Sequence, residues 1–322
     1  MSLRAALPLA ALLLLGALAS LLVGPAQLSL SEVLGGIGGR GDADTVAIMQ
    51  GIRLPRTLGA LGVGAGLGAS GAALQGFTRN DLAAPGLLGF SACAALGAVI
   101  ALYFNQSVWI VPAALLGATL GASVTAALAW RRIGAGGLIL AGIGVGALAT
   151  ALTGLAMNLA PNPWALSELT YWLMGSLDGI DRPALLTLLP LTGLGIALLA
   201  ISGRGLRALG LGEDVARSMG VDLAKLQALV VVGTALCVGA GVAVAGAIGF
   251  VGLFVPHMVR RLTGPDPATL VLRSAAAGAL FLLVTDTGAR LLAGPGQPLY
   301  LGIVTALIGV PFFLYLAVGR SS

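Results

Sequence analysis

Polar side chains in this sequence fall in short groups between long apolar stretches. About 20 apolar residues are enough for a helix to cross a bilayer. We predict ten such spans, over residues 5–25, 57–76, 87–104, 108–130, 138–158, 184–202, 226–246, 247–262, 272–292 and 302–318. The seventh and eighth spans share one continuous apolar stretch, so Gly246 and Gly249 alone mark the turn between them. The pattern predicts an all-α polytopic membrane protein.

The composition supports this class. Of the 322 residues, 58% are hydrophobic and 9% are charged, with a mean hydropathy of +1.02, whereas a globular domain carries about 25% charged residues. The net charge of +5 comes from arginines at the ends of apolar stretches, which is not the pattern of a nucleic-acid-binding protein. Cys93 and Cys237 lie inside apolar stretches and predict no disulfide framework. Residues 1–322 therefore form a single transmembrane domain in the lipid bilayer.

The basic residues predict the orientation of the spans. If the N-terminus is cytoplasmic, five basic residues lie outside, namely Arg40, Arg53, Arg56, Arg182 and Arg290. Twelve lie inside, namely Arg4, Arg79, Arg131, Arg132, Arg204, Arg207, Arg217, Lys225, Arg260, Arg261, Arg273 and Arg320. This bias is the one expected when both termini are cytoplasmic. Residues 1–27 could also be read as a signal peptide, but we favour a retained first span.

The densest polar segment of the chain is 203–225, between the sixth and seventh spans. Within it, Glu213 and Asp214 suit the first turn of a short helix, Arg217 its last turn, and Gly220 a left-handed cap. Glu213 and Arg217 have the favourable i,i+4 spacing, and Asp222 suits the N-cap of the following span. The segment is either a solvated loop or a surface on which another protein docks.

Small residues predict how two of the spans pack. The second span contains Gly64-x-x-x-Gly68 among many other glycines, which predicts close packing in the centre of the bundle. Residues 63–72 match residues 238–247 at six of ten positions, and on the predicted topology these segments run in opposite directions. The match is either a weak inverted repeat or a chance similarity between two Gly/Ala-rich stretches.

Two segments predicted to lie outside carry further candidates. Arg53 and Arg56 stand at the mouth of the second span, against the positive-inside trend. They either dock a partner or anchor the span among lipid headgroups. Residues 158–183 are rich in aromatic and acidic side chains. This segment is either an interfacial belt or surface helix, or the lining of a substrate mouth.

The sequence lacks the motifs of an enzyme. It has no GxxxxGK[ST] loop, no Cys/His cluster and no Ser/His/Asp set. His257, near the inner end of its span, is best explained as a structural or interfacial residue rather than a metal or haem ligand. Asp286 and Arg290, one helical turn apart, are the only clear ionisable pair inside the spans. An ion-coupled secondary transporter needs more titratable groups at mid-membrane, so it stays only as the alternative class.

The chain resembles the FecCD-like permeases of type II ABC importers, which take up iron-siderophores, haem and vitamin B12. The segments that carry the resemblance extend over nearly the whole chain. They are Arg53-Leu-Pro-Arg56, Ser70-Gly-Ala-Ala-Leu-Gln75, Arg79-Asn80, Pro85-Gly-Leu-Leu-Gly89, Trp172-Leu-Met-Gly-Ser176, Leu211-Gly-Glu-Asp-Val-Ala216, Met219-Gly-Val221, Gly249-Phe-Val-Gly-Leu253, Pro256-His257, Arg260, Asp286, Arg290, Gly302-Ile-Val-Thr-Ala306 and Pro311-Phe-Phe313.

The resemblance implies ten helices per subunit, a second permease subunit (here a homodimer), two ABC ATPase subunits that bind ATP and Mg, and a substrate-binding protein. It implies no cofactor, metal or catalytic residue in this chain, and a place in the inner membrane. The segment after the sixth span becomes the ATPase-coupling element, through Leu211, Gly212, Glu213, Asp214, Ala216, Arg217, Met219, Gly220 and Val221. Arg53, Arg56 and Arg290 become the residues that dock the binding protein. The implied substrate is a metal chelate, with a siderophore preferred over haem or vitamin B12.

The chain departs from the family pattern at two places. Where the family has Arg-Asn-Pro-Leu-Ala-Asp-Pro, this chain reads Arg79-Asn-Asp-Leu-Ala-Ala-Pro85. The usual Glu-Leu-Pro before the last span is here Pro298-Leu-Tyr300. The second change removes a carboxylate near the outer mouth and adds an aromatic ring, which is compatible with a different substrate subgroup.

Overall fold

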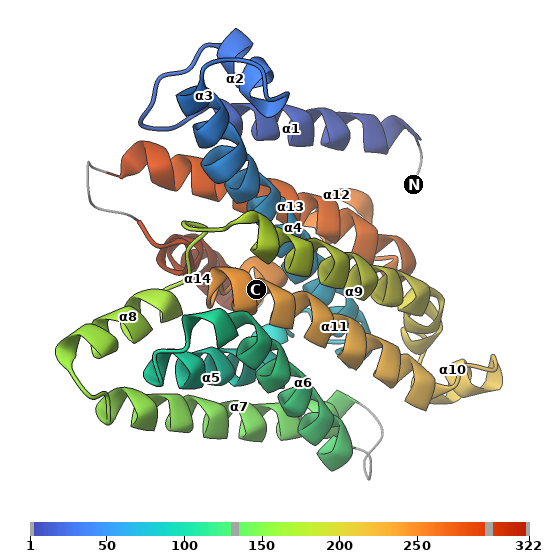
Figure 1. Cartoon of the computed structure of the whole chain (residues 1–322). Helices are drawn as coiled ribbons and strands as arrows, with labels where there is room; N and C mark the ends of the chain where they lie inside the picture. The colour runs from blue at the N-terminus through green and yellow to red at the C-terminus, as the bar shows by residue number, and fades with distance from the viewer. Residues whose placement is uncertain (1–2, 130–134, 294–298, 320–322) are drawn as a thin grey trace.

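The computed structural model describes residues 3–129, 135–293 and 299–319, and within them the chain is helical, with no strand. Ten helices coincide with the ten predicted spans (Figure 1). They are α1 (Leu3–Leu22), α4 (Leu54–Thr78), α5 (Phe90–Tyr103), α6 (Ile110–Ala129), α7 (Ala135–Asn158), α9 (Arg182–Leu209), α11 (Leu223–Ala245), α12 (Val251–Thr263), α13 (Pro267–Leu292) and α14 (Leu301–Gly319). The all-α membrane fold predicted from the sequence is confirmed. Pro298, Arg131, Arg132 and Arg320 lie outside the described residues.

Four shorter helices lie at the two ends of this bundle (Figure 1). They are α2 (Leu30–Ile37), α3 (Ala43–Ile48), α8 (Pro163–Leu173) and α10 (Glu213–Ser218). The sequence analysis did not predict α2 and α3, although Ser29 and Glu32 form a capping box on α2 and Asp42 caps α3. A π-helical turn, Met49–Arg53, joins α3 to α4, so one helix runs over Ala43–Thr78.

Figure 1 places α2, α3 and α8 at one end of the bundle and α10 at the other, with the start of α1 on the α10 side. We call these the α8 end and the α10 end. Ion pairs and hydrogen bonds show that α4 and α11 are antiparallel. Arg79, just after α4, lies 3.6 Å from Glu213 of α10, the short helix that precedes α11, and Asp178 beside the start of α4 lies close to the end of α11. The two similar segments, 63–72 and 238–247, therefore run in opposite directions.

Helix α4 occupies the centre of the bundle, as its glycines predicted. Gly64 packs against the backbone of Gly278 in α13, and Gly68 packs against the carbonyl of Ser274, so that any larger side chain would collide with the backbone. Gly71 meets Gly252 of α12 in the same way. Because lipid is as apolar as the helix surfaces, such close backbone approach supplies much of the packing energy in a membrane bundle.

Two helix ends differ from the predicted boundaries in an informative way. The sixth span was predicted to end at residue 202, but α9 continues to Leu209 because Gly203 and Gly205 allow Ala268 and Leu226 to pack against it. The segment expected over 203–225 is therefore a loop only over residues 210–222, with α10 inside it. Between α11 and α12 the turn predicted from Gly246 and Gly249 is an irregular segment, 246–250, that ends with Phe250 at φ +65°.

Candidate coupling face and substrate pathway

Helix α10 has the local structure that its sequence predicts. Gly212 precedes it at φ +114° and Gly220 follows it at φ +82°, conformations that disfavour residues with a side chain. Glu213 and Arg217 lie 3.6 Å apart, and Asp214 lies 3.3 Å from the same guanidinium. Asp222 caps α11 by accepting hydrogen bonds from the N–H groups of Ala224 and Lys225, and the Lys225 bond chiefly lowers its pKa.

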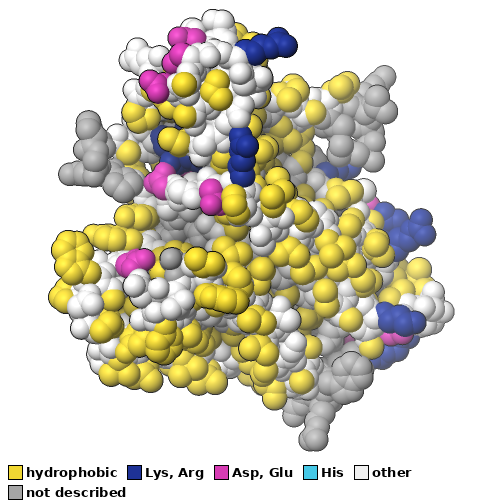
Figure 2. All heavy atoms as spheres, in the orientation of Figure 1, with side chains coloured by type: hydrophobic (Ala, Val, Ile, Leu, Met, Phe, Trp, Pro, Cys, Tyr) yellow, Lys and Arg dark blue, Asp and Glu magenta, His cyan; other side chains and the backbone are white. Residues whose placement is uncertain are grey.

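One face of α10 is held by the bundle and the other faces outward. Ala216 is fully buried, and Val221 packs on the core. Leu211, Val215 and Met219 expose 66%, 43% and 62% of their surface. Large apolar side chains this exposed, flanked by charges, indicate a contact surface for another protein. We call these three side chains the coupling face. Figure 2 shows acidic and basic side chains gathered near this end, whereas the middle of the molecule is mainly hydrophobic.

At the α8 end, two of the predicted docking arginines hold the end of α1. Arg53 is 4% exposed, and it donates to the carbonyls of Leu21 (2.7 Å), Leu22 (3.0 Å) and Ala26. Arg290 donates to the carbonyls of Ser20 (3.1 Å) and Val23 (2.7 Å). The last carbonyls of a helix have no partner inside the helix and carry a partial negative charge. The two guanidiniums therefore act as a C-terminal cap for α1.

The third docking arginine, Arg56, belongs to an ion-pair network that the sequence analysis saw only in part. The predicted pair of Asp286 and Arg290 is present, with 3.1 Å between Oδ2 and Nε. Arg56 binds the same Asp286 carboxylate at 2.8 Å through Nη2 and also pairs with Asp178. Asp286 is fully buried. The network thus joins α4, α13 and the segment before α9.

All three arginines predicted to dock a binding protein therefore point into the protein in this structure. Their guanidinium groups bind the carbonyls at the end of α1 and the Asp286 carboxylate, so they do not extend from the surface. The docking role remains a prediction. The sequence does not show whether such a guanidinium points outward or into the protein. In both cases the pattern is the same, an arginine at the end of an apolar stretch. Asp178 is 122 positions from Arg56 in the sequence, so their spacing could not predict that they form an ion pair.

The aromatic and acidic segment predicted over residues 158–183 forms α8 and one wall of a cavity of about 780 Å³. Tyr171 and Tyr300 stack at 5.8 Å between ring centroids, with their planes 6° apart. Trp164, Glu168 and Asp178 also line it, and no Lys or Arg is among the described residues that line this cavity. Tyr300 is one of the residues at which the chain departs from the family pattern. We call this cavity the mouth.

Behind the mouth, three chain segments meet at glycines. Leu301 N–H donates to Gly175 O at 2.9 Å, and Gly302 N–H donates to Met174 O at 3.1 Å. A methyl group on Gly175 would lie 2.5 Å from the carbonyl oxygen of Ala247, and Gly246 and Gly302 are equally confined. The end of α8, the irregular segment 246–250 and the start of α14 are thus locked together without room for side chains.

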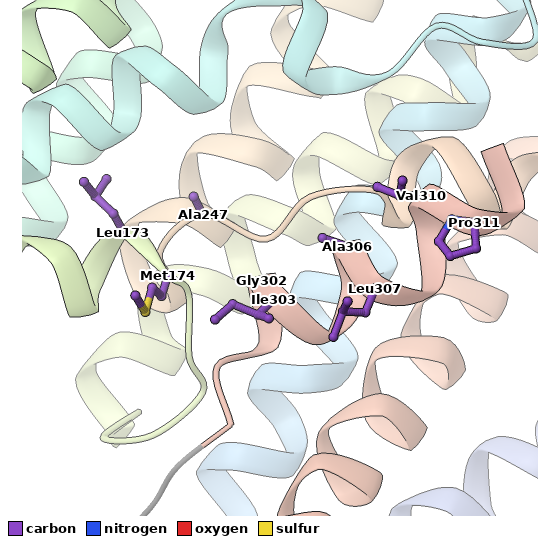
Figure 3. A pocket seen from close by; sticks show the side chains of 9 residues that line it. All are labelled: Leu173, Met174, Ala247, Gly302, Ile303, Ala306, Leu307, Val310 and Pro311. Carbon is purple, nitrogen blue, oxygen red and sulfur yellow. The ribbon is translucent and has the colours of Figure 1, made fainter. Parts of the chain in front are cut away.

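A second cavity of about 550 Å³ lies on the other side of this junction. Figure 3 shows its lining, which comes from the end of α8, from Ala247 and from one face of α14. The side chains are apolar throughout, including Met174, Ile303, Leu307 and Pro311. A cavity without charge or hydrogen-bonding side chains can let a bulky solute pass without binding it tightly. We call it the apolar cavity.

No described group of three His, Cys, Asp or Glu side chains is arranged as a metal site. His257 is buried near the α10 end of α12, with its ring 5.6 Å from that of Phe312.

Comparisons with known proteins agree with this architecture. The model of the FecCD transport family matches residues 12–319. The cobalamin import system permease BtuC of Halobacterium salinarum is 40% identical over 86% of this chain and 75% of its own length. The Fe(3+)-citrate import permease YfmD of Bacillus subtilis is 37% identical over 84% and 81%. A solved metal-chelate type ABC transporter in an inward-facing conformation is 31% identical, with a TM-score of 0.89 over 98% of this chain and 99% of that one.

Proposed function

The chain belongs to the FecCD transport family, and from that premise we propose that it imports a ferric siderophore across the inner membrane. It is a multi-pass permease subunit of an ABC importer and not an enzyme. In the proposed assembly, two copies enclose the pathway, two ATPase subunits bind ATP and Mg, and a binding protein delivers the chelate. The proposed orientation puts both termini and the α10 end in the cytoplasm.

The single observation that best supports energy coupling is the coupling face on α10. The helix is too short to be stable alone, yet glycines, ion pairs and the buried Ala216 fix it at one end of the bundle. The three apolar side chains of the coupling face, on α10 and on the residues that flank it, are exposed in the described chain. A separate ATPase whose cleft covers Leu211, Val215 and Met219 would bury them, and its movement would then displace α10.

The mouth supports a substrate class. Its described lining offers stacked tyrosines and two carboxylates, of which Asp178 is already paired with Arg56 and Glu168 has no ion-pair partner. Such a surface attracts a neutral or cationic chelate with an apolar face and repels an anionic one. A ferric hydroxamate siderophore fits this description, whereas ferric citrate is anionic.

Vitamin B12 is the second candidate. The relatives of this chain include cobalamin permeases, and a neutral corrin could also pack on the tyrosines. Both candidates are bulky and can be accommodated by apolar walls.

The test is uptake by proteoliposomes that contain the permease with its ATPase subunits and binding protein. Ferrioxamine B, cyanocobalamin, haem and ferric citrate are each supplied with and without ATP inside. We expect ATP-dependent accumulation of ferrioxamine B in preference to the others. Accumulation of cyanocobalamin or haem alone would replace the siderophore assignment, and accumulation of ferric citrate alone would show that the charge of the mouth does not select the substrate.

A further inference from the structure

A tight turn follows α4 at the α10 end of the bundle. Arg79 takes the left-handed conformation at φ +51°, which is costly for a residue with a side chain. The N–H of Asn80 donates to Gln75 O at 3.2 Å, and the Asn80 side chain accepts the N–H of Leu82 at 2.9 Å. These bonds hold residues 79–84 in a compact turn. We call it the α4 turn.

One side of the α4 turn touches the coupling helix. The guanidinium of Arg79 lies 3.6 Å from the carboxylate of Glu213, in the first turn of α10. Glu213 is also 3.6 Å from Arg217, so it links the α4 turn to both ends of α10. The side chains of Arg79 and Glu213 are 46% and 31% exposed, which leaves them free to adjust when α10 is displaced.

The other side of the α4 turn contacts α12. Asp81 pairs with Arg260, whose side chain is only 17% exposed. Arg260 also donates to the side-chain oxygen of Gln75 at 3.0 Å, and the Gln75 amide reaches the carbonyls of Leu253 (3.3 Å) and Gly252 (3.4 Å). From residue 252 to residue 260 is about 12 Å along a helix axis. The α4 turn and the end of α4 thus hold α12 at both its ends.

The far end of α12 reaches the wall of the apolar cavity. Phe250, in the left-handed region just before α12, packs against Gly309 of α14, where a methyl group would lie 2.5 Å from the phenylalanine Cβ. The next residue, Val310, lines the apolar cavity. Phe254 and Phe312 add an edge-to-face ring contact at 4.6 Å. A shift of α12 must therefore move α14 or break these contacts.

We propose that the ion pair between Asp81 and Arg260 is the joint that carries a displacement of α10 to α12 and so to the α14 wall of the apolar cavity. Its parts are a positioning carboxylate on the α4 turn and a shielded guanidinium on α12. The carboxylate stands three positions before the aspartate of the family pattern, at 81 rather than 84. The inference rests on the proposed transport function.

The experiment measures chelate imported per ATP hydrolysed by the complete complex in proteoliposomes, with ferrioxamine B carrying radioactive iron as the probe. Asp81→Asn removes the charge and keeps the shape. We expect the ratio to fall about tenfold, within the range typical of coupling between sites, while ATP hydrolysis continues. Asp81→Glu should restore most of the ratio. The matched control is Asp266→Asn, which breaks the 2.7 Å pair between Arg207 of α9 and the N-cap of α13 at the same end without removing any contact of Asp81 or Arg260, and should leave the ratio unchanged.

A double-mutant cycle shows whether the pair of Asp81 and Arg260 transmits movement from α10 or only stabilises the fold. If the joint lies on the route from α10, adding Asp81→Asn to Glu213→Ala lowers the ratio no further. Independent, multiplying losses would overturn the proposal, as would a normal ratio in Asp81→Asn. If Asp81→Asn does not fold, the ratio of chelate imported to ATP hydrolysed is measured in Arg260→Lys instead. Lysine keeps the charge but cannot bridge Asp81 and Gln75 with two nitrogens. A wild-type complex that imports none of the four chelates with ATP refutes the proposed function itself, whereas normal import of cyanocobalamin or haem only changes the probe.

Discussion

Asp286 is the residue whose loss should most damage the folded protein. Its carboxylate has no exposed surface and lies 2.8 Å from Arg56 and 3.1 Å from Arg290, whose side chains are 16% and 13% exposed. Asp286→Ala leaves two shielded guanidiniums without their shared counter-charge. Removing one partner of a buried ion pair costs about 3–5 kcal/mol, which corresponds to roughly a 100- to 5,000-fold change in the folding equilibrium.

The network predicts an order among variants that a simple pair does not. In Arg290→Ala, the carboxylate keeps Arg56, so the loss should be the smallest. In the double variant Asp286→Ala with Arg290→Ala, the remaining Arg56 keeps Asp178, and the loss should be intermediate. Asp286→Ala alone should be the worst. The assay is the fraction of monodisperse protein recovered on size-exclusion chromatography after a graded heat treatment in detergent.

Two results would refute this reasoning. If Asp286→Ala survives heating as well as Arg290→Ala, the carboxylate does not hold both guanidiniums. If the double variant is no better than Asp286→Ala alone, then the uncompensated charge of Arg290 is not what destabilises the single variant. Asp286→Asn, which keeps the shape and one acceptor oxygen, separates the loss of charge from the loss of packing.

Three other outcomes are expected. Replacing Glu213 and Arg217 together by alanine should lower chelate import per ATP severalfold without loss of folded complex, whereas unchanged import and unchanged stimulation of the ATPase would remove α10 from the coupling route. Gly64→Leu should abolish folded protein on size-exclusion chromatography because its side chain meets the α13 backbone, whereas Gly193→Leu, which meets nothing within 4 Å, should be tolerated; equal yields would show that α13 can move away. The pKa of Asp266 is lowered chiefly by the hydrogen bond from its arginine partner. Its contribution to stability is therefore present above its ordinary value of 3.8 and is lost as pH falls through the lower, folded-state pKa. The thermal stability advantage of wild type over Asp266→Asn should disappear at that acidic pH, and an advantage independent of pH would contradict this.

The positions of the spans could be predicted because each depends on one local quantity, the length of an apolar stretch. The same holds for α10, whose glycines, charges and spacing lie within nine residues. Helices α2 and α3 were not predicted, although Ser29, Glu32 and Asp42 signal their starts. They are only eight and six residues long, and Val33 is buried by packing on Leu21 and Met49, which is a contact between distant segments.

The direction in which a charged side chain points could not be predicted at the α8 end. Arg53 lies one residue before α4, and its direction depends on the π-helical turn Met49–Arg53 and on where α1 ends. Both are set by tertiary packing. The same limit applied to Asp81, which in the sequence is only an altered residue in a loop and in the structure is the partner of Arg260.

The two ends of the bundle therefore resist deformation to different extents. At the α8 end, Arg53, Arg290, Asp286 and Arg56 join α1, α4 and α13 through shielded charges, and separating any of them exposes an uncompensated group at a cost of several kcal/mol. At the α10 end, the pairs that hold α10 have partners such as Arg217, with 54% of its side chain exposed, and exposed pairs contribute only about 0–1 kcal/mol each. A force applied to the coupling face is therefore relieved most cheaply by rearrangement at the α10 end. In the proposed transport cycle, the α8 end, held together by its buried arginines, is the fixed support against which α12 and α14 would shift.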